Sequence, residues 1–294
     1  MTVLAVMFTA LAGFGQAPDV CKTLYSPDVD LEHGPLPTNF AVVGVASNFW
    51  GLDGSDTAPI ATSPALTMVN DYLSIKTLTA TTVCHNATAT LKANASNYDS
   101  LFLADDTAYT VGSFPFSYAR GIPVIFGYQT DTPDVNNLIA SKAVISGTQH
   151  TIANANLASY GISSNTEYLA LANPTLAPYG AAAEDIITAM GISYPPPTAY
   201  PTLFSNIALT FSAVGTNPGL GYVKAGFVSK AQICSITNEV TYVEFINPVF
   251  TLDQTASVVN TSNTVAVDLY FYIQAQISSE DWPTFLTNFC YQAP

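Results

Sequence analysis

The chain has 294 residues, with 21 acidic side chains against 7 Lys and Arg, and a formal net charge of -14 at pH 7. A long-range field of that sign repels nucleic acid and anionic lipid, which argues against binding to either. Hydrophobic residues make up 49% of the chain and charged residues only 10%, so there is enough apolar surface to build the core of one large domain or two smaller ones.

Residues 1–17 predict a secretory signal peptide, because the apolar run Val3 to Leu11 is followed by small residues that suit cleavage after Ala17. The run is too short to span a bilayer. An ordinary apolar strand or helix is the alternative, since no Lys or Arg precedes Lys22. Residues 18–38 contain several prolines and little periodicity, and we interpret them as an extended leader.

From residue 39 onward, apolar or β-branched runs alternate with helical patterns. Phe40 to Ala46 is almost continuously apolar, which is typical of a strand buried on both faces of a parallel sheet. We expect further strands at 79–84, 100–104, 122–128, 168–172, 225–228, 241–245 and 255–259. We expect helices at 64–73, 88–95, 181–190, 207–214, 265–277 and 279–292, and a helical turn at 135–139.

This alternation predicts an α/β fold with mostly parallel sheets flanked by helices, arranged as two lobes. We assign residues 39–122 and 241–294 to lobe 1, and residues 123–240 to lobe 2. The hinge is then expected at the two crossovers, near Gly121 to Val124 and Thr237 to Tyr242.

The four cysteines are far apart and contain no CxxC motif for zinc or redox chemistry: they are Cys21, Cys84, Cys234 and Cys290. Two disulfides would fit an exported protein, in the periplasm or outside the cell, and the sequence leaves their pairing open. Four buried thiols are the alternative. Three triplets have the spacing of N-glycosylation acceptors, at Asn86, Asn94 and Asn260.

Polar or small residues stand at four predicted junctions where a helix begins: Ser47-Asn48, Thr88, Tyr179-Gly180 and Asn206-Ile207. A helix start exposes unpaired N–H groups and a positive dipole end. Several such starts around one cleft would therefore hold an anion without any basic residue. At each junction the alternative is a simple N-cap, because helices generally prefer Ser, Thr and Asn there.

Five segments in order along residues 40–290 resemble the molybdate- and tungstate-binding proteins of ABC importers, which are type II periplasmic solute-binding proteins. The segments are Ala-Ser-Asn-Phe at 46–49, Phe-Leu-Ala-Asp at 102–105, Phe-Ser-Tyr-Ala at 116–119, Asn-Pro-Thr-Leu-Ala-Pro-Tyr-Gly at 173–180 and Ala-Gly-Phe-Val-Ser at 225–229. The stretch that ends in Ala-Pro-Tyr-Gly is the most specific of the five.

The resemblance implies a two-lobed protein that captures a tetrahedral oxyanion in a cleft between the lobes and presents it to a membrane ABC permease. It implies no enzyme activity and no cofactor, and a metal only within the bound oxyanion. By position, Ser47 and Asn48 would supply a hydroxyl and backbone N–H groups, and Thr88 a hydroxyl and its N–H. Tyr179 would supply its phenol or N–H, and Ile207 its backbone N–H.

One turn departs from the family pattern, which has a Gly- and Ser-rich turn where this chain has Cys-His-Asn-Ala-Thr-Ala at 84–89. His85 or Asn86 would then replace part of the ligand contact. This departure leaves open a second reading, in which a secreted structural or surface protein retains the fold but has a lost or altered ligand site.

Other chemistry has little support in the sequence. His33, His85 and His150 lack the spacing of a zinc site, and no nucleophile and base can be named for a hydrolase. Asp105 and Asp106 are adjacent after a strand and would point apart, so we read them as a helix cap and a solvated acid.

Overall fold

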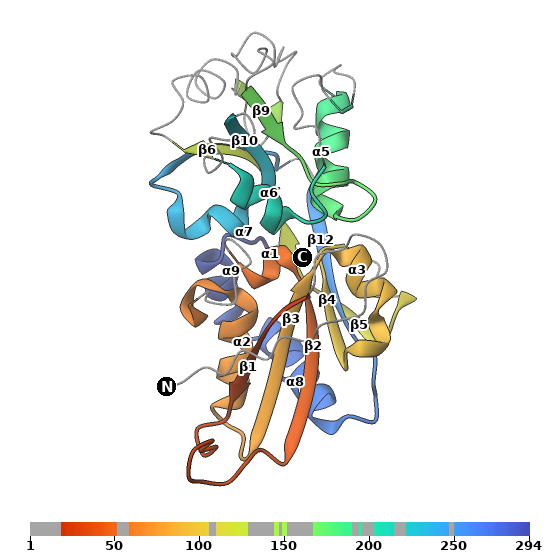
Figure 1. Cartoon of the computed structure of the whole chain (residues 1–294). Coiled ribbons are helices and arrows are strands. Elements are labelled where there is room, and N and C mark those ends of the chain that lie inside the picture. The colour runs from red at the N-terminus through yellow and green to blue at the C-terminus, as the bar shows by residue number, and fades with distance from the viewer. Residues whose placement is uncertain are drawn as a thin grey trace. The chain divides into compact units, whose positions relative to one another are not determined.

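The computed structural model describes residues 19–51, 59–105, 110–128, 144–146, 149–151, 167–189, 194–195, 203–214, 222–246 and 250–294. The predicted signal peptide and the helical turn predicted at 135–139 lie outside these residues. The chain divides into two compact units (Figure 1). The first unit runs to Arg120 and resumes from Asp253 to Pro294, and the second unit is Gly121–Leu252.

The first unit is built on a six-stranded sheet with the order β1-β3-β2-β4-β12-β5. Its strands are β1 (Val20–Tyr25), β2 (Asn39–Ala46), β3 (Thr79–Asn86), β4 (Ser100–Leu103), β5 (Ser113–Gly121) and β12 (Leu252–Val258). The central strand β2 runs parallel to both β3 and β4, whereas β1 is antiparallel to β3 and β12 to β4. The strands predicted at 40–46, 79–84, 100–104 and 255–259 are confirmed, with slightly different ends.

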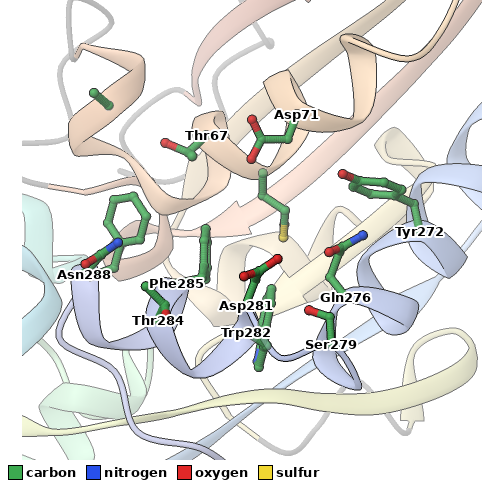
Figure 2. A pocket seen from close by; sticks show the side chains of 13 residues that line it. Thr67, Asp71, Tyr272, Gln276, Ser279, Asp281, Trp282, Thr284, Phe285 and Asn288 are labelled. Atoms are coloured by element: carbon green, nitrogen blue, oxygen red, sulfur yellow. The ribbon is translucent and has the colours of Figure 1, made fainter.

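Five helices belong to this unit: α1 (Ser47–Trp50), α2 (Pro64–Leu73), α3 (Thr88–Ala93), α8 (Thr264–Ile277) and α9 (Trp282–Asn288), besides the short turns η1 (Ile60–Thr62) and η2 (Ala95–Asn97). Helix α2 packs on β1 and β3, and α8 packs on β2 and β4. A pocket is lined by residues of η1, α2, α8 and α9 and of the turn before α9 (Figure 2).

The last helix is shorter than the predicted 279–292, for two local reasons. Pro283 is tolerated only in the first turn, so the helix begins at Trp282. At the other end Cys290 has a φ of 59°, the left-handed conformation that terminates helices. The backbone N–H of Tyr291 then bonds to the carbonyl of Leu286 at 2.8 Å and closes the last turn.

The prediction of an extended leader over residues 18–38 is wrong for Val20–Tyr25. These residues form β1, which pairs with β3 in a register that sets Cys21 opposite Cys84, and a disulfide joins the two. All four cysteines lie among the described residues, and none of them is a free thiol. The inward positions of β1 are held by Lys22 and Leu24, so a lysine interrupts the apolar alternation that would have indicated a strand.

The second unit contains a four-stranded sheet with the order β11-β6-β10-β9. Its strands are β6 (Pro123–Tyr128), β9 (Glu167–Ala170), β10 (Tyr222–Ser229) and β11 (Val240–Glu244), and β7 (Val144–Ser146) pairs separately with β8 (Gln149–Thr151). The helices are α5 (Pro178–Ala189), α6 (Ile207–Ala213) and α7 (Lys230–Ile233), followed by the turn η5 (Cys234–Ile236). These elements confirm the predicted strands and helices of this region.

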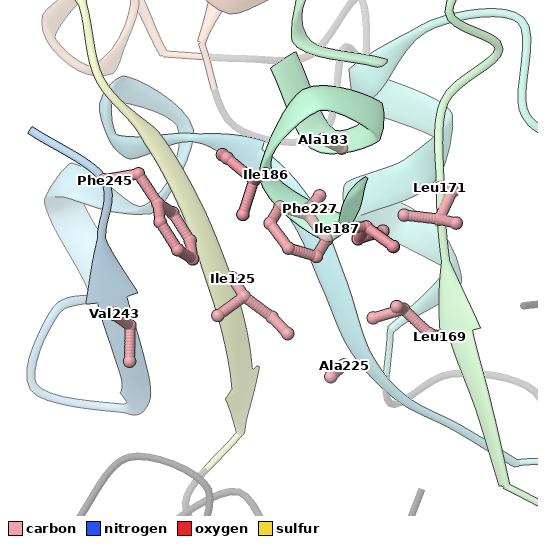
Figure 3. Close-up of a cluster of buried hydrophobic side chains, with 10 residues drawn as sticks. All are labelled: Ile125, Leu169, Leu171, Ala183, Ile186, Ile187, Ala225, Phe227, Val243 and Phe245. Atoms are coloured by element: carbon pink, nitrogen blue, oxygen red, sulfur yellow. The ribbon is translucent and has the colours of Figure 1, made fainter. Parts of the chain in front are cut away.

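The core of the second unit lies between α5 and the sheet (Figure 3). Ile186 and Ile187 of α5 pack against Leu169 of β9 and Phe227 of β10, and all four side chains are buried. Phe227 stacks on Phe245, with ring centroids 5.7 Å apart. This packing holds α5 against β9 and β10.

Two expectations about the organisation need correction. Residues 241–252 belong to the second unit and not to lobe 1, because β11 pairs with β6 from Val240 opposite Tyr128 to Glu244 opposite Val124. The sheets are also mixed and not mostly parallel, since β6, β11 and β12 pair antiparallel with their neighbours. Apolar runs reveal that a strand is buried but carry no information about its direction.

Candidate functional site

Two helix starts lie at the same edge of the first unit's sheet. Helix α1 begins at Ser47 directly after β2, and α3 begins at Thr88 shortly after β3. The strands are parallel neighbours with Ala46 opposite Asn86, so their carboxyl ends, and the helix starts that follow, come together. Ser47 and Thr88 are both buried.

Neither of these helices is capped by a side chain. The N-cap positions are Ala46 and Ala87, and no side-chain hydrogen bond closes either start. Ser47 and Thr88 are the first helical residues and not the caps that the alternative interpretation required. The first-turn N–H groups of α1 and α3 therefore lack the partner that a Ser, Thr or Asn cap supplies.

The hydroxyl groups at the two starts have few competing partners. Thr88 Oγ1 accepts a hydrogen bond from the N–H of Ala104 at 3.2 Å, which leaves its proton available for donation. Ser47 Oγ lies 3.4 Å from Nδ1 of His85. The arrangement thus offers hydroxyl and amide donors at one sheet edge.

Asn48 faces the interior of the first unit. Its Nδ2 donates to Oε1 of Gln254 and to the hydroxyl of Tyr291, each at 2.9 Å, and the Tyr291 hydroxyl donates to the Asn48 carbonyl at 3.0 Å. The hydroxyl of Tyr118 also donates to Gln254 Oε1, at 2.9 Å. All four residues are buried, so the Asn48 side chain anchors α1, and only its backbone N–H would remain as a ligand donor.

The side chains of His85 and Asn86 are also buried. The His85 ring lies against Trp50, with centroids 4.8 Å apart. Asn86 Nδ2 donates to Asp19 Oδ1 at 2.6 Å, and its Oδ1 accepts from the N–H of Ala87. A buried amide held on both sides cannot serve as a glycosylation acceptor in the folded chain.

Asp19 is a functional candidate that sequence reasoning missed. Its carboxylate accepts hydrogen bonds from Asn86 and from the hydroxyl of Tyr98, and so places a negative charge beside the residues that lead into α3. Burial, and then the hydrogen bond to Asp19, raise the pKa of Tyr98 well above its ordinary value, so the phenol stays protonated. The only sequence signal was an acid just before a strand, inside the presumed leader.

In the second unit Tyr179 lies in the first turn of α5 and is buried. Its hydroxyl accepts a hydrogen bond from Ser229 Oγ at 3.0 Å. Ser229 Oγ in turn accepts a hydrogen bond from the N–H of Ala231. The starts of α5 and α7 therefore lie at one sheet edge. Gly180 is required there, because a Cβ would stand 2.6 Å from the carbonyl oxygen of Ala172.

Ile207 is the first residue of α6, and its helix start is capped in the ordinary way. Asn206 is the N-cap and its Oδ1 accepts from the N–H of Leu209 at 2.9 Å. A bridge between Phe204 and Ala172 brings this start to the carboxyl end of β9. The structure thus gathers Ser47, Asn48, Thr88, His85 and Asn86 at one edge of the first unit, and Tyr179 and Ile207 at one edge of the second.

Other candidates lie elsewhere. Asp105 forms an ion pair with Lys92, with 3.6 Å between Oδ2 and Nζ, and Asp106 lies outside the described residues. Within the part of the chain that the structure describes, no three His, Cys, Asp or Glu side chains are grouped to hold a metal ion. None of the described helices is both long and apolar enough to cross a membrane.

No protein-family model and no curated protein matches the sequence. Solved structures do. The periplasmic molybdate-binding protein of Azotobacter vinelandii is similar with a TM-score of 0.54 and 17% identity, over 86% of this chain and 99% of that one. The substrate-binding protein of an ABC transporter from Agrobacterium tumefaciens gives 0.56 and 9%, over 94% and 85%.

The substrate-binding domain of a putative molybdenum ABC transporter from Clostridium difficile is also similar. Its TM-score is 0.51 at 11% identity, over 87% of this chain and all of that one. Regulatory and effector-binding domains are similar to a comparable degree. At these identities the likeness concerns the fold. The chain has the two-lobed fold of periplasmic binding proteins, with two mixed sheets flanked by helices.

Proposed function

We propose that this chain is an extracytoplasmic solute-binding protein, which captures a tetrahedral oxyanion such as molybdate or tungstate between its two lobes and delivers it to a membrane ABC permease. The fold is the one that periplasmic solute-binding proteins use, and a molybdate-binding protein is among those similar to it. The observation that supports an anionic ligand is the pair of buried helix starts at Ser47 and Thr88, each of which has alanine at the N-cap position and no side-chain cap.

The proposed chemistry relies on neutral donors. With a net charge of -14, the protein surface cannot attract an anion, so a dianion must be held by short-range hydrogen bonds in a dry cavity. The hydroxyls of Ser47 and Thr88 and the first-turn N–H groups would donate from one lobe, and the starts at Tyr179 and Ile207 would donate from the other. Hydrogen bonds to an ionised acceptor are about twice as strong as neutral ones.

Ligand binding would then favour a closed state of the two lobes, because only that state brings both sets of donors to the anion. A set of donors without an acceptor would disfavour protonated phosphate, whose own proton would remain unpaired. Discrimination against sulfate would follow from the size of the cavity. The disulfide between Cys21 and Cys84 fits a location outside the cytoplasm, in the periplasm or extracellular space.

Calorimetric titration with molybdate, tungstate, sulfate and phosphate tests this function. We expect saturable heat with molybdate or tungstate, and a loss of at least about tenfold in affinity for Ser47→Ala or Thr88→Val, since each removes a charge-assisted hydrogen bond. Ser100→Ala is a matched control, because Ser100 is fully buried in β4 and its hydroxyl has no partner among the described residues. If no oxyanion releases heat or raises the melting temperature, the proposal is wrong.

The position of Asp19 favours the alternative, a secreted structural or surface protein with a lost or altered ligand site. A carboxylate next to Asn86 opposes a dianion at the start of α3. Asp19→Asn separates the two cases. If the Asp19 charge only lowers the affinity of a functional site, the variant binds the oxyanion more tightly than the native chain does. If the site is lost, neither chain binds.

A further inference from the structure

A cavity lies wholly within the first unit and uses none of the residues proposed to bind the oxyanion. It is a pocket of about 720 Å³ between α2, α8 and α9, a volume within the range of small-molecule sites. One side is aromatic: Trp282 and Phe285 stack with centroids 4.8 Å apart, and Phe289 packs on Phe285 at 4.9 Å. Trp282 donates its ring N–H to the carbonyl of Tyr118, so its apolar ring is what lines the pocket.

The charged lining is acidic. Asp71 and Asp281 both line the pocket, and none of its lining residues is Lys, Arg or His. Figure 2 shows the two carboxylates on opposite sides of the pocket, Asp71 from α2 and Asp281 from the start of α9. Asp281 occupies the N-cap position of α9, yet its side chain makes no capping hydrogen bond. The acid that would ordinarily close this helix instead lines the pocket.

The two carboxylates also lack counter-charges, since neither takes part in an ion pair among the described residues. Burial raises the pKa of Asp71 above its ordinary value. Burial, and then the Asp71 charge, raise the pKa of the neighbouring Tyr272 phenol. A positive group beside Asp71 would therefore offset a carboxylate that is partly removed from water.

We infer that this pocket binds a small organic cation, with its ammonium group between Asp71 and Asp281 and its apolar body against Trp282 and Phe285. Carboxylates supply the charge complementarity, and aromatic faces attract ammonium groups through their negative quadrupole. The assignment follows from the combination of the two, since a purely apolar solute would leave both acids unused. An anionic solute would be repelled by them.

Titration of the full chain with benzyltrimethylammonium, in a buffer without amines, tests the inference. We expect saturable binding that weakens about tenfold in Asp71→Asn/Asp281→Asn, from the loss of two partly exposed ion pairs. The control Glu239→Gln/Glu280→Gln removes the same charge from two exposed residues outside the lining and should bind within about twofold of the native chain. Benzyl alcohol, which keeps the ring without the charge, should bind far more weakly than the cation.

A second variant tests the same pocket in case the Asp71→Asn/Asp281→Asn variant fails to fold. Phe285→Leu keeps the apolar volume but removes a ring, and we expect about a threefold loss of affinity for the cation. Absence of saturable binding by the native chain, equal binding by the native chain and the Asp71/Asp281 variant, or equal binding of benzyl alcohol would each overturn the inference. Oxyanion titration of the same variants should remain unchanged, which keeps the two sites distinguishable.

Discussion

The helix starts of the two units differ in how their N–H groups are satisfied. In the second unit, Asn206 caps α6 and Ser229 caps α7 through a reciprocal capping box. In the first unit, α1 and α3 follow Ala46 and Ala87, which cannot cap. All four helix starts follow or adjoin strand ends, yet α1 and α3 are the two of these four that have no hydrogen bond from an N-cap side chain. Cap identity therefore decides which first-turn amides remain for a ligand: at α6 the cap bonds the Leu209 N–H and not the Ile207 N–H, whereas at α1 and α3 no cap bonds any of them.

The first unit holds its uncapped starts by other means. The disulfide fixes the edge of β3 that leads into α3, and the buried contacts of Asn48 with Gln254 and Tyr291 fix α1. Helix starts with unsatisfied N–H groups are less stable than capped ones, so these anchors compensate for the missing caps. The comparison therefore predicts that anchors matter most in the first unit, and caps in the second.

Loss of the disulfide should have the largest effect. Cys21 and Cys84 are 63 residues apart, and loss of a disulfide that closes a loop of that length costs about 4 kcal/mol, mainly through the greater freedom of the unfolded chain. We expect Cys21→Ala/Cys84→Ala to lower the protection of β1 and β3 amides from hydrogen exchange. The amides of β9 and β10 are the internal control, and equal loss in both sheets would contradict the comparison.

Tyr291→Phe should have the next largest effect. The variant removes a hydroxyl that accepts from Asn48 Nδ2 and donates to the Asn48 carbonyl, which leaves buried polar groups unpaired at about 1–3 kcal/mol. The loosened α1 should also bind the oxyanion more weakly. Denaturant unfolding and titration measure the two effects, and Tyr25→Phe on the edge strand β1, where no hydrogen bond involves the hydroxyl among the described residues, is the matched control.

Local patterns predicted most of the elements, because caps, prolines and apolar runs act within a few residues. Ser63 caps α2 through its side chain and Pro64 takes the first helical position, and the side chain of Asn263 caps α8. The polar residues at the predicted strand-to-helix junctions also located Ser47 and Thr88 at helix starts.

What the sequence could not reveal depends on contacts between distant residues. Asn48 bonds to residues 206 and 243 positions away, so its anchoring role leaves no local signal. The same holds for Asp19, whose partner Asn86 lies 67 positions away. Strand β1 was missed because Lys22 takes an inward position, and the directions of β6 and β11 are decided by pairing alone.

Exchanging the caps should have the smallest effect and is the most direct test of the comparison. Asn206→Ala removes the bond to the Leu209 N–H and should cost about 1 kcal/mol in the free energy of unfolding. Ala87→Ser introduces a hydroxyl at the N-cap of α3, which we expect to leave stability unchanged or slightly higher while it competes for the amides proposed to hold the anion. Unfolding by urea and oxyanion titration of both variants measure this contrast. If Ala87→Ser binds the oxyanion as the native chain does, the uncapped amides of α3 take no part in binding, and Thr88 would contribute through its hydroxyl alone.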